Sequence, residues 1–355
     1  MSIPILIPTV PTLKSIAPFL ERIDESRRYS NYGPLEQELR GVIAGYIGCD
    51  PQNVATAANA TVAIQGAIQA SGFVLNKWNL PSWTFAASAA ASINSGAAVR
   101  FVDIQPDWRA KFEDVESCVV DVLPFGDDLE PSRYVNRPSS VVDAAASIGS
   151  LRNSFSQIRD LRVFVIVSMH ATKLIPAGEG SFVFSGDADW INRFRAWTNF
   201  GFQNDRQSNS IGTNGKLSEY SAAVGLASFK ESSGILSRYK TLADKFLKLT
   251  TDFGYECHPA MKKGLVTPYW IIETSSPREK SNMVELAKKW GIETRDWWGK
   301  GCHAMPAFQN VEKNELAETK RVASQSIGLP FHLYLNDDDI LVLAKFLAEC
   351  RAKVS

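Results

Sequence analysis

The chain has 355 residues, of which 45% are apolar and 21% are charged, and its 38 basic side chains balance 38 acidic ones. A chain of this length can bury a full core and is expected to form one large and one small domain. Balanced charge gives no field that would attract nucleic acid or an anionic membrane, so we expect small-molecule partners.

The cysteine and histidine content argues against disulfide and metal sites. Five cysteines are scattered without any Cys-x-x-Cys pair, and none of the four histidines stands at metal-ligand spacing from another. The first residues are apolar but lack a basic segment and are broken by prolines, unlike a signal peptide, and no run reaches membrane-spanning length. We therefore expect a reduced, cytoplasmic protein without a metal.

Short β-prone runs alternate with small-residue helical stretches from about residue 54 to residue 184, which predicts a mostly parallel sheet covered by helices. Helices are predicted at Thr61–Ala70 and Phe85–Ser95. The predicted strands are Val54–Ala58, Leu80–Thr84, Val99–Asp103, Val119–Leu123, Ser140–Asp143, Val163–Ser168 and Ser181–Phe184. The fold class is therefore α/β.

Longer helical segments follow, predicted at Ala188–Thr198, Ser218–Lys230 and Ser237–Phe253. The interruption near Glu231–Gly234 suggests a boundary between a large domain, residues 1–233, and a small one, residues 234–355. In the second part we expect a strand at Tyr269–Glu273, a helix opened by Ser276-Pro277 and a terminal amphipathic helix from about Asn336.

Lys173 lies between two apolar, strand-like runs, where an amine is less hydrated than on the surface and can form a Schiff base with an aldehyde. Ser168 and His170 closely precede it. The serine could add a hydroxyl to a phosphate site, and His170 could orient groups or relay protons, although a lone histidine more often packs or forms a hydrogen bond. Gly178-Glu179-Gly180 lets this loop turn back into the next strand.

Three more features lie where predicted strands end. Asn59-Ala60-Thr61 opens a helix and could bind phosphate with its free N–H groups, or could be an ordinary N-cap. Asp143 brings a carboxylate to the sheet edge where α/β folds bind ligands, and it could pair with a protonated ring nitrogen or cap a helix. Phe85 and Trp83 could sandwich a planar ring or pack in the core.

Trp297-Trp298 beside Arg295 indicates a binding surface or a subunit interface, because two adjacent tryptophans cannot both point into a core in regular structure. Taken together, an amine, an acid, a phosphate-binding helix start and a stacking ring meet the requirements of pyridoxal 5'-phosphate.

The order and the sequences of these motifs resemble those of the DegT/DnrJ/StrS sugar aminotransferases, a branch of the fold-type I pyridoxal-phosphate enzymes. This resemblance implies a large domain with a mostly parallel sheet flanked by helices, followed by a smaller C-terminal α+β domain. The similar segments are Ser30–Leu39, Ala58–Thr61, Pro81–Phe85, Val142–Ala145, Ser168–Lys173, Gly178–Gly180, Arg195–Phe202, Gly212–Ala223 and Gly291–Trp298 followed by His303.

The resemblance implies that Lys173 forms the Schiff base with the cofactor, with His170 as a further catalytic candidate. Asp143 would hold the pyridine nitrogen and Phe85 would stack on the ring. Asn214 would reach the phosphate bound by a neighbouring subunit, which implies a homodimer with shared active sites. The implied phosphate-binding residues of the subunit itself are Ala60, Thr61 and Ser168, and the implied substrate-binding residues are Tyr32, Arg295, Trp297 and His303.

The implied reaction moves an amino group from L-glutamate to the 4-keto position of a 6-deoxy sugar linked to dTDP, UDP or GDP, for a surface glycan such as O-antigen. The sequence His-Ala-Thr-Lys resembles the corresponding sequence of the 4-aminotransferase branch. One alternative is a sugar dehydratase of the same fold, in which histidine replaces the lysine. Others are a non-catalytic, regulatory pyridoxal-phosphate protein and an α/β protein without a cofactor.

Two departures from the family pattern stand out. Ala146 occupies the position where the family usually has Gln or His, so a contact to the cofactor is missing or supplied elsewhere. The segment between Asp103 and Asp143 is shorter than usual, which predicts a trimmed helix, although Pro124-Phe125-Gly126 keeps the family's turn.

Overall fold

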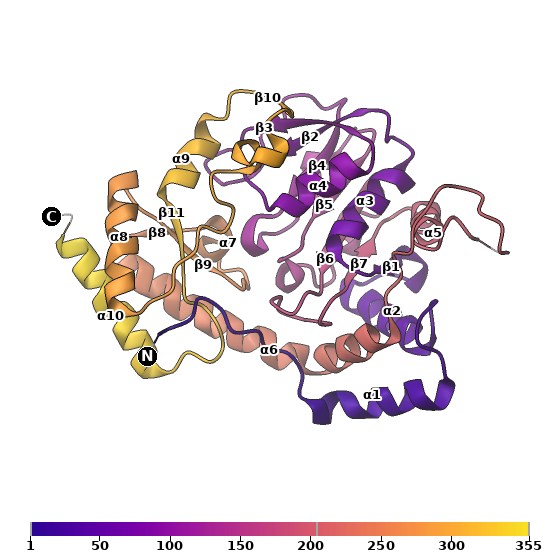
Figure 1. Ribbon diagram of the computed structural model, residues 1–355, viewed down its shortest axis with the longest axis horizontal. Helices are drawn as coiled ribbons and strands as arrows, with labels where there is room; N and C mark the ends of the chain where they lie inside the picture. The colour runs from indigo at the N-terminus through magenta and orange to yellow at the C-terminus, as the bar shows by residue number, and fades with distance from the viewer. Residues whose placement is uncertain (1, 204, 354–355) are drawn as a thin grey trace.

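A computed structural model describes residues 2–203 and 205–353, and Figure 1 shows its two sheets with the helices around them. Within these residues the large sheet has the order β1-β7-β6-β5-β4-β2-β3-β10. Its strands are β1 (Val54–Ala57), β2 (Lys77–Pro81), β3 (Ala98–Val102), β4 (Cys118–Val122), β5 (Ser140–Asp143), β6 (Val163–Ser168), β7 (Ser181–Phe184) and β10 (Glu312–Lys313). Strand β7 is antiparallel to both of its neighbours, and the other neighbouring pairs are parallel. The predicted class is confirmed.

The helices pack on the sheets and between them (Figure 1). Their bounds are α1 (Leu13–Ser26), α2 (Pro34–Ile47), α3 (Ala60–Ser71), α4 (Ala86–Asn94), α5 (Ala188–Trp197), α6 (Glu219–Asp252), α7 (Pro259–Lys262), α8 (Pro277–Trp290), α9 (Ala317–Gln325) and α10 (Asp337–Ala352). None of the helices in the described part of the chain combines the length and the apolarity needed to cross a bilayer.

The central strand β6 is apolar on both faces because helices cover both sides of the sheet. Val163, Val165 and Val167 point to one face and pack in the same cluster as α2 and α6. Phe164 and Ile166 point to the other face and pack with α3, α4 and α5. This alternation follows from the two-residue period of a strand. The loop that follows β6 is therefore anchored to a strand that is packed on both faces.

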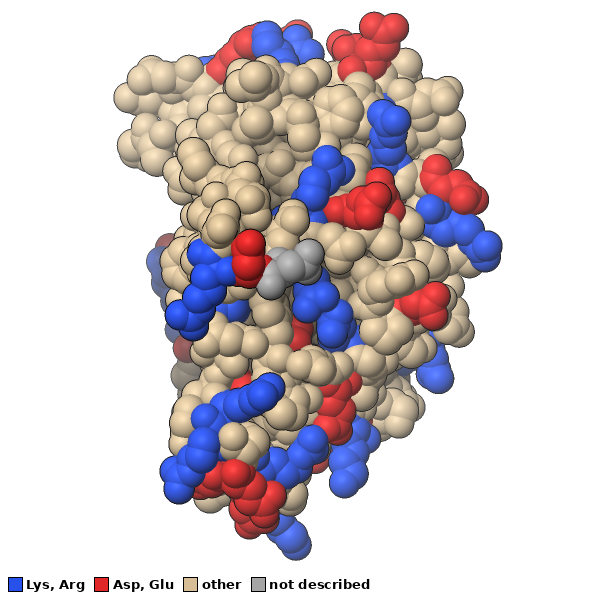
Figure 2. Space-filling model, turned by 90° about the vertical axis from the view of Figure 1, so that its right-hand side faces the viewer, with Lys and Arg blue, Asp and Glu red and all other residues tan. Residues whose placement is uncertain are grey.

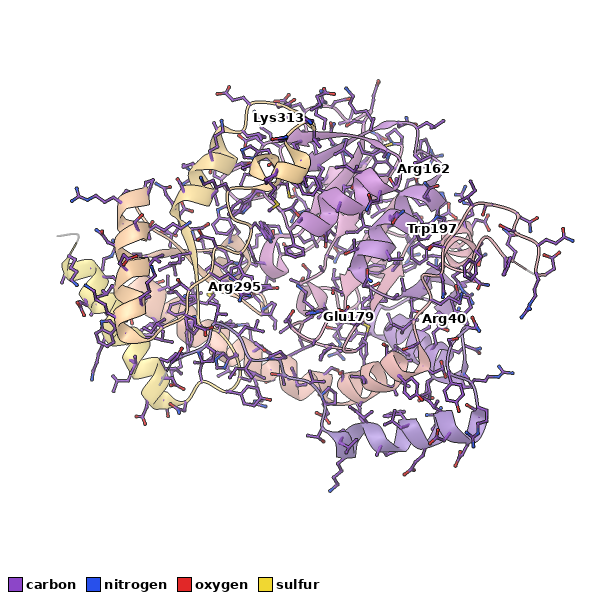
Figure 3. All side chains as sticks on the ribbon, viewed as in Figure 1. Arg40, Arg162, Glu179, Trp197, Arg295 and Lys313 are labelled. Carbon is purple, nitrogen blue, oxygen red and sulfur yellow. The ribbon has the colours of Figure 1, made fainter. Side chains whose placement is uncertain are left out.

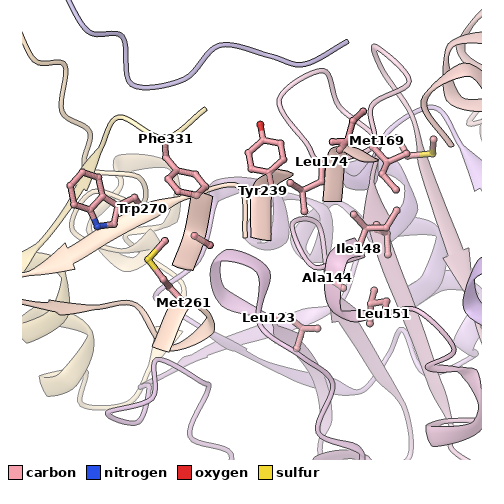
Figure 4. Packing of buried hydrophobic residues seen from close by; sticks show 14 of the residues in the cluster. Leu123, Ala144, Ile148, Leu151, Met169, Leu174, Tyr239, Met261, Trp270 and Phe331 are labelled. Atoms are coloured by element: carbon pink, nitrogen blue, oxygen red, sulfur yellow. The ribbon is translucent and has the colours of Figure 1, made fainter. Parts of the chain in front are cut away.

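The small sheet has the order β11-β9-β8 and is antiparallel, with β8 (Glu256–Cys257), β9 (Trp270–Glu273) and β11 (Ser326–Leu329). Figure 4 shows Trp270 of this sheet with Met261 of α7 and Phe331, and Tyr239 of α6 lies between them and Leu151. All of these side chains belong to one buried cluster. The two sheets therefore share one apolar cluster.

Several helix boundaries follow directly from local sequence. Ser276 caps α8 by accepting the N–H of Glu279, and Pro277 occupies the first turn, as predicted. Asn336 and Asp339 form a capping box at the start of α10, so the predicted terminal helix is also confirmed.

Helix α6 corrects the prediction of two helices separated near Glu231–Gly234, because it runs unbroken from Glu219 to Asp252. Gly234 in this helix is exposed and costs only about 1 kcal/mol relative to alanine, which packing of the helix against the shared cluster outweighs. The suggested division between residues 233 and 234 falls inside this helix and stays an interpretation. Ile3, moreover, pairs with the second part of the chain through Gly291 and Glu293.

Two further details concern strand β2 and the segment between β3 and β5. Strand β2 spans Lys77–Pro81 instead of the predicted Leu80–Thr84, so the prediction lay three residues too far along the chain. Between β3 and β5 the described chain forms β4 and two short 3₁₀ turns, Pro124–Gly126 and Pro131–Tyr134, without an α-helix. The trimming relative to the family pattern stays a prediction.

Candidate active site

Asp143 and Ser168 are the last residues of the neighbouring parallel strands β5 and β6. Asp143 is in register with Ile166, so both polar side chains lie at the carboxyl edge of the large sheet. Ligands bind at this edge in open α/β sheets. The prediction that both groups reach this edge is confirmed, whereas their roles stay predictions.

The Asp143 carboxylate is buried, with 7% of the residue exposed, and it is held from two sides. Ser88 of α4 donates its hydroxyl to Oδ2 at 2.6 Å, and the N–H of Ala145 donates to Oδ1 at 3.0 Å. Burial raises the pKa of Asp143, and these two hydrogen bonds and the charge of Lys173 offset that rise only in part. In the described chain no α-helix begins directly after Asp143, so the alternative role as an α-helix cap is wrong.

Lys173 lies in the loop that joins β6 to β7. The loop folds back on itself because Met169 and Ala171 donate their N–H groups to the carbonyls of Gly180 and Gly178. Gly178 adopts a φ of +78°, a conformation that favours glycine, so the predicted sharp turn is confirmed. This closed loop brings the half-buried Lys173 side chain to the edge near Asp143.

The hydroxyl of Tyr269 accepts a hydrogen bond from Lys173 Nζ at 2.9 Å. Tyr269 precedes β9 of the small sheet and is 96 positions away along the chain. Sequence reasoning missed this tyrosine and Ser88. A lone serine in an alanine-rich helix was a weak signal for the latter, and nothing local indicated that Tyr269 faces the other sheet.

Helix α3 begins at Ala60 beside the same edge. Asn59 caps it by accepting the N–H of Val62 at 2.9 Å, so the N-cap interpretation is confirmed, while the N–H groups of Ala60 and Thr61 remain available for an anion. The carbonyl of Gly215 accepts the N–H of Ala58 at 2.8 Å. The exposed Asn214 therefore lies on a loop that passes next to this helix start.

The two aromatic candidates that follow β2 have different surroundings. Phe85 precedes the first residue of α4, and it is 61% exposed. Trp83 is buried and packs edge-to-face against Trp108 and Trp298. Phe85 thus offers a free ring face at the sheet edge, and Trp83 belongs to the core.

His170 points toward its own loop. Its Nδ1 lies 2.9 Å from the Thr172 hydroxyl, its Nε2 lies 3.7 Å from Glu179, and 45% of its side chain is exposed. Among the described residues no hydrogen bond joins the imidazole to the Lys173 amine, which supports a role in orienting the loop more than a role in proton relay.

Trp297 and Arg295 lie next to Tyr269. The Trp297 ring packs edge-to-face on Tyr269 with centroids 4.7 Å apart, and the Arg295 guanidinium lies 5.0 Å from the Trp297 ring centre. Trp298 is buried and stacks on Phe125, which confirms that the two tryptophans diverge. Figure 3 labels the exposed Arg295 beside the small sheet and Glu179 of the lysine loop nearer the centre.

His303 lies 2.7 Å from the Ser82 hydroxyl through Nδ1. Partial burial and the positive charges of Lys320 and Lys313 lower its pKa. His303 lines a cavity of about 850 Å³ between α8 and α9, together with Lys280, Asp296, Lys300 and Lys320. With Glu285, the lining has three lysines and two acidic residues, and Lys280 pairs with Asp296 at 2.8 Å.

Tyr32 lies apart from the other predicted substrate residues, before α2. Its hydroxyl donates to the Arg195 carbonyl at 2.9 Å and lies 2.9 Å from the Thr198 hydroxyl. No contact joins it to Arg295, Trp297 or His303 within the described residues. A role for Tyr32 at this chain's own lysine is therefore not supported by these contacts.

The residues at the sheet edge fit pyridoxal phosphate. A carboxylate has about four lone-pair positions, of which Ser88 and Ala145 occupy two, so Asp143 retains acceptor capacity. The exposed ring of Phe85, the free N–H groups of α3 and the Lys173 amine supply the remaining requirements of this cofactor.

The sequence profile of the DegT/DnrJ/EryC1/StrS aminotransferase family matches residues 13–121 and 139–347. Protein Rv3402c of Mycobacterium tuberculosis is 27% identical over 99% of this chain and 90% of its own length. The dTDP-4-amino-4,6-dideoxy-D-glucose transaminase of Shigella dysenteriae is 26% identical over 97% of this chain and 98% of its own.

The crystal structure of DesI in the presence of its TDP-sugar product is similar over almost the whole fold. It matches with a TM-score of 0.86 and 27% identity, covering 99% of this chain and 93% of DesI. Since the family profile spans most of the sequence and the site fits its cofactor, the chain belongs to the DegT/DnrJ/EryC1/StrS aminotransferase family, whose enzymes depend on pyridoxal phosphate.

Proposed function

We propose that the protein transfers the amino group of L-glutamate to the 4-keto position of a nucleotide-linked 6-deoxy sugar. The observation that carries the transfer is the Lys173 amine at the same sheet edge as the buried Asp143 carboxylate. The sugar substrate is supported by the name of the Shigella dysenteriae relative and by the TDP-sugar product in the DesI structure. The 4-amino sugar would serve a surface glycan such as O-antigen.

Pyridoxal phosphate supplies an aldehyde carbon that bonds to amines and a ring that accepts electrons. The N–H groups of Ala60 and Thr61, with the Thr61 and Ser168 hydroxyls, would hold its phosphate. The Asp143 carboxylate would keep a proton on the ring nitrogen, an interaction that burial strengthens because little solvent screens it. Phe85 would pack on one face of the ring.

Lys173 Nζ is proposed to move the proton in both half-reactions. It takes a proton from the α-carbon of glutamate, and later gives a proton to the sugar carbon that has received the nitrogen. His170 would hold the lysine loop in place through Thr172 and Glu179.

Arg295, Trp297 and His303 would bind the nucleotide sugar, and Lys300 and Lys320 of the cavity at His303 would contact its diphosphate. We further propose a cytoplasmic homodimer in which Asn214 reaches the phosphate held by the partner. The exposed position of Asn214 allows that contact. Tyr32, which contacts none of the other substrate-binding candidates of its own chain, would then bind the substrate of the partner subunit.

The test is to load the purified protein with pyridoxal phosphate, record its visible absorption, and add L-glutamate followed by dTDP-, UDP- and GDP-linked 4-keto-6-deoxy sugars. We expect a visible band that glutamate bleaches and one of the keto sugars restores, with an amino sugar as product. Lys173→Arg keeps the charge but should lose the band and the turnover. A variant that retains both would refute the proposal.

The same assay separates the alternatives. A sugar dehydratase would give a deoxy sugar that carries no new amino group, and a regulatory protein would form the band and bind a nucleotide sugar without turnover. The presence of lysine at position 173, where the dehydratases have histidine, disfavours the first of these.

A further inference from the structure

Lys173 has one hydrogen-bond partner for its amine among the described residues, and that partner belongs to the other sheet. The amine donates to the Tyr269 hydroxyl at 2.9 Å. Tyr269 is 7% exposed, whereas Lys173 is half-buried. The contact therefore joins a mostly buried phenol to the amine of the lysine loop.

The backbone of Tyr269 is fixed on both sides of its Cα. Its N–H donates to the Thr267 hydroxyl at 3.1 Å, and its carbonyl accepts from His258 Nε2 at 3.0 Å. The Thr267 hydroxyl in turn donates to the carbonyl of Phe125 at 2.6 Å. These bonds tie the residue to the turn that follows β4 of the large sheet.

The ring of Tyr269 is fixed as well. Phe125 packs edge-to-face on it with centroids 5.5 Å apart, and Trp297 does so at 4.7 Å. Edge-to-face aromatic pairs stabilise a defined ring orientation. The hydroxyl therefore points in one direction, toward the lysine loop.

A close approach of two segments makes this geometry possible. Gly126 has a φ of +103°, and a Cβ there would lie 3.3 Å from the Cα of Thr267 and 3.4 Å from the carbonyl of Ala146. Gly126 thus lies between the backbone of Thr267, two residues before Tyr269, and the carbonyl of Ala146 in the Asp143–Ala146 turn.

A phenol hydroxyl can accept a hydrogen bond from an ammonium group and can donate one to a neutral amine. Tyr269 therefore remains a partner for Lys173 whichever protonation state the amine has. A transferase lysine whose amine is free during part of the reaction cycle needs such a partner, because an unrestrained amine would sample many rotamers.

We propose that Tyr269 is a positioning residue for Lys173, whose hydroxyl holds the free amine at the sheet edge so that it is aimed at the cofactor carbon. This inference rests on the proposed role of Lys173. It assigns to a residue of the small sheet the task of keeping the amine ready for bond formation and proton transfer.

The experiment compares Tyr269→Phe with Tyr46→Phe in the cofactor-free protein. Each variant loses one hydroxyl that makes one hydrogen bond, but Tyr46 donates to the Ile148 carbonyl and does not contact Lys173. Two quantities are measured for each protein: the rate at which the visible band appears after mixing with pyridoxal phosphate, and the equilibrium affinity for pyridoxamine phosphate, which needs no bond to the lysine.

For Tyr269→Phe we expect band formation to slow by roughly tenfold, because orientation of the amine is lost, with pyridoxamine-phosphate affinity within about twofold of wild type. Tyr46→Phe should change neither quantity. Unchanged band formation in Tyr269→Phe would overturn the inference. So would a parallel loss of both quantities, which indicates a general structural role.

These outcomes are separable from failure of the proposed function. If the wild-type protein forms no band with pyridoxal phosphate, the proposed role of Lys173 is wrong, and the proposed function fails together with the inference about Tyr269. If the wild type forms the band and Tyr269→Phe forms it equally fast, only the inference about Tyr269 fails.

Discussion

His258 is a fully buried histidine that contacts the backbone of Tyr269, the partner of Lys173. Its ring contacts Phe125 and Trp108, and its Nε2–H donates to the carbonyl of Tyr269. Burial lowers the pKa of His258 from 6.5 to about 4, despite the opposing effect of this hydrogen bond. The folded protein therefore keeps a neutral imidazole where the unfolded chain would bind a proton.

The first prediction concerns stability at acid pH. Between pH 6.5 and about 4 the unfolded chain binds a proton at His258 and the folded protein does not, so the free energy of unfolding should fall as pH decreases, by about 3 kcal/mol from this residue. His258→Gln keeps a donor but cannot titrate, so its unfolding free energy should depend less on pH across this window. Urea denaturation at several pH values measures the difference. His170→Gln, at a half-exposed position, is the control and should keep the wild-type slope.

The second prediction concerns the Asp143 charge. Asp143→Asn preserves size and can still accept the Ser88 hydroxyl, but it removes the charge proposed to hold the ring proton. We expect the half-reaction with glutamate to slow by roughly 100-fold or more. Stopped-flow absorbance measures this rate.

Ser88→Ala is the matched control for Asp143→Asn, since it removes one neutral donor and leaves the carboxylate. Its rate should fall by no more than about tenfold. A rate for Asp143→Asn within twofold of wild type would rule out the ring-nitrogen role.

At the scale of elements, a buried ion network fixes the turn after β4 against α7. Arg109 pairs with Asp127 at 3.0 Å and with Asp121 at 3.4 Å, and Lys263, just after α7, pairs with Asp127 at 2.7 Å. Burial alone would raise the pKa of Asp121, but the charges of Arg133 and Arg109 hold it below its usual value. Because Phe125 lies in this turn, the network also helps to locate the partner of Tyr269.

Helix packing leads to the third prediction. A Cβ at Gly66 of α3 would lie 2.6 Å from the Trp197 ring and 2.9 Å from the Phe194 ring of α5, so Gly66→Ala should destabilise the protein by about 1–3 kcal/mol. Gly234 of α6 is exposed, and a methyl group added there would meet no atom within 4 Å, so Gly234→Ala should stabilise by about 0.5–1 kcal/mol. Midpoints of urea unfolding measure both, and equal effects in the same direction would contradict this account of the two helices.

At the scale of the whole molecule, α6 and the shared apolar cluster join the two sheets, so the lysine loop and the Tyr269 segment are parts of one packed body (Figures 1 and 4). On the face shown in Figure 2, cationic and anionic side chains are interspersed. That distribution agrees with the balanced charge of the sequence.

The fourth prediction tests whether active sites are shared between two subunits. A heterodimer of one Lys173→Ala subunit and one Asn214→Ala subunit, purified through two different tags, contains one intact site if Asn214 acts across the interface. We expect about half of the wild-type activity per dimer, since a two-fold dimer has two equivalent sites. Both mutant homodimers should be much less active. If Asn214 acts within its own subunit, the heterodimer stays as inactive as the homodimers.

The sequence predicted much of the fold because many of its signals are local. Two-residue alternation and apolar runs marked β1 and β3–β7, and Ser276-Pro277 and Asn336 marked the starts of helices. The failures have both local and non-local causes. An exposed glycine near position 234 resembled a boundary, and β8, β10, β11 and α9 are short elements held by partners that lie far away in the sequence.

By itself, the sequence determined the family, the cofactor, the placement of Asp143 and Ser168 at strand ends and the position of Lys173 in the loop after a strand, because residue types and the order of the strands can be read from the sequence. Only the tertiary structure decided which residues surround that lysine. The Tyr269 contact joins positions 96 apart, and the exposure of Phe85 beside a buried Trp83 depends on packing between elements. Such contacts arise from how the two sheets pack through α6, and no local periodicity encodes that packing.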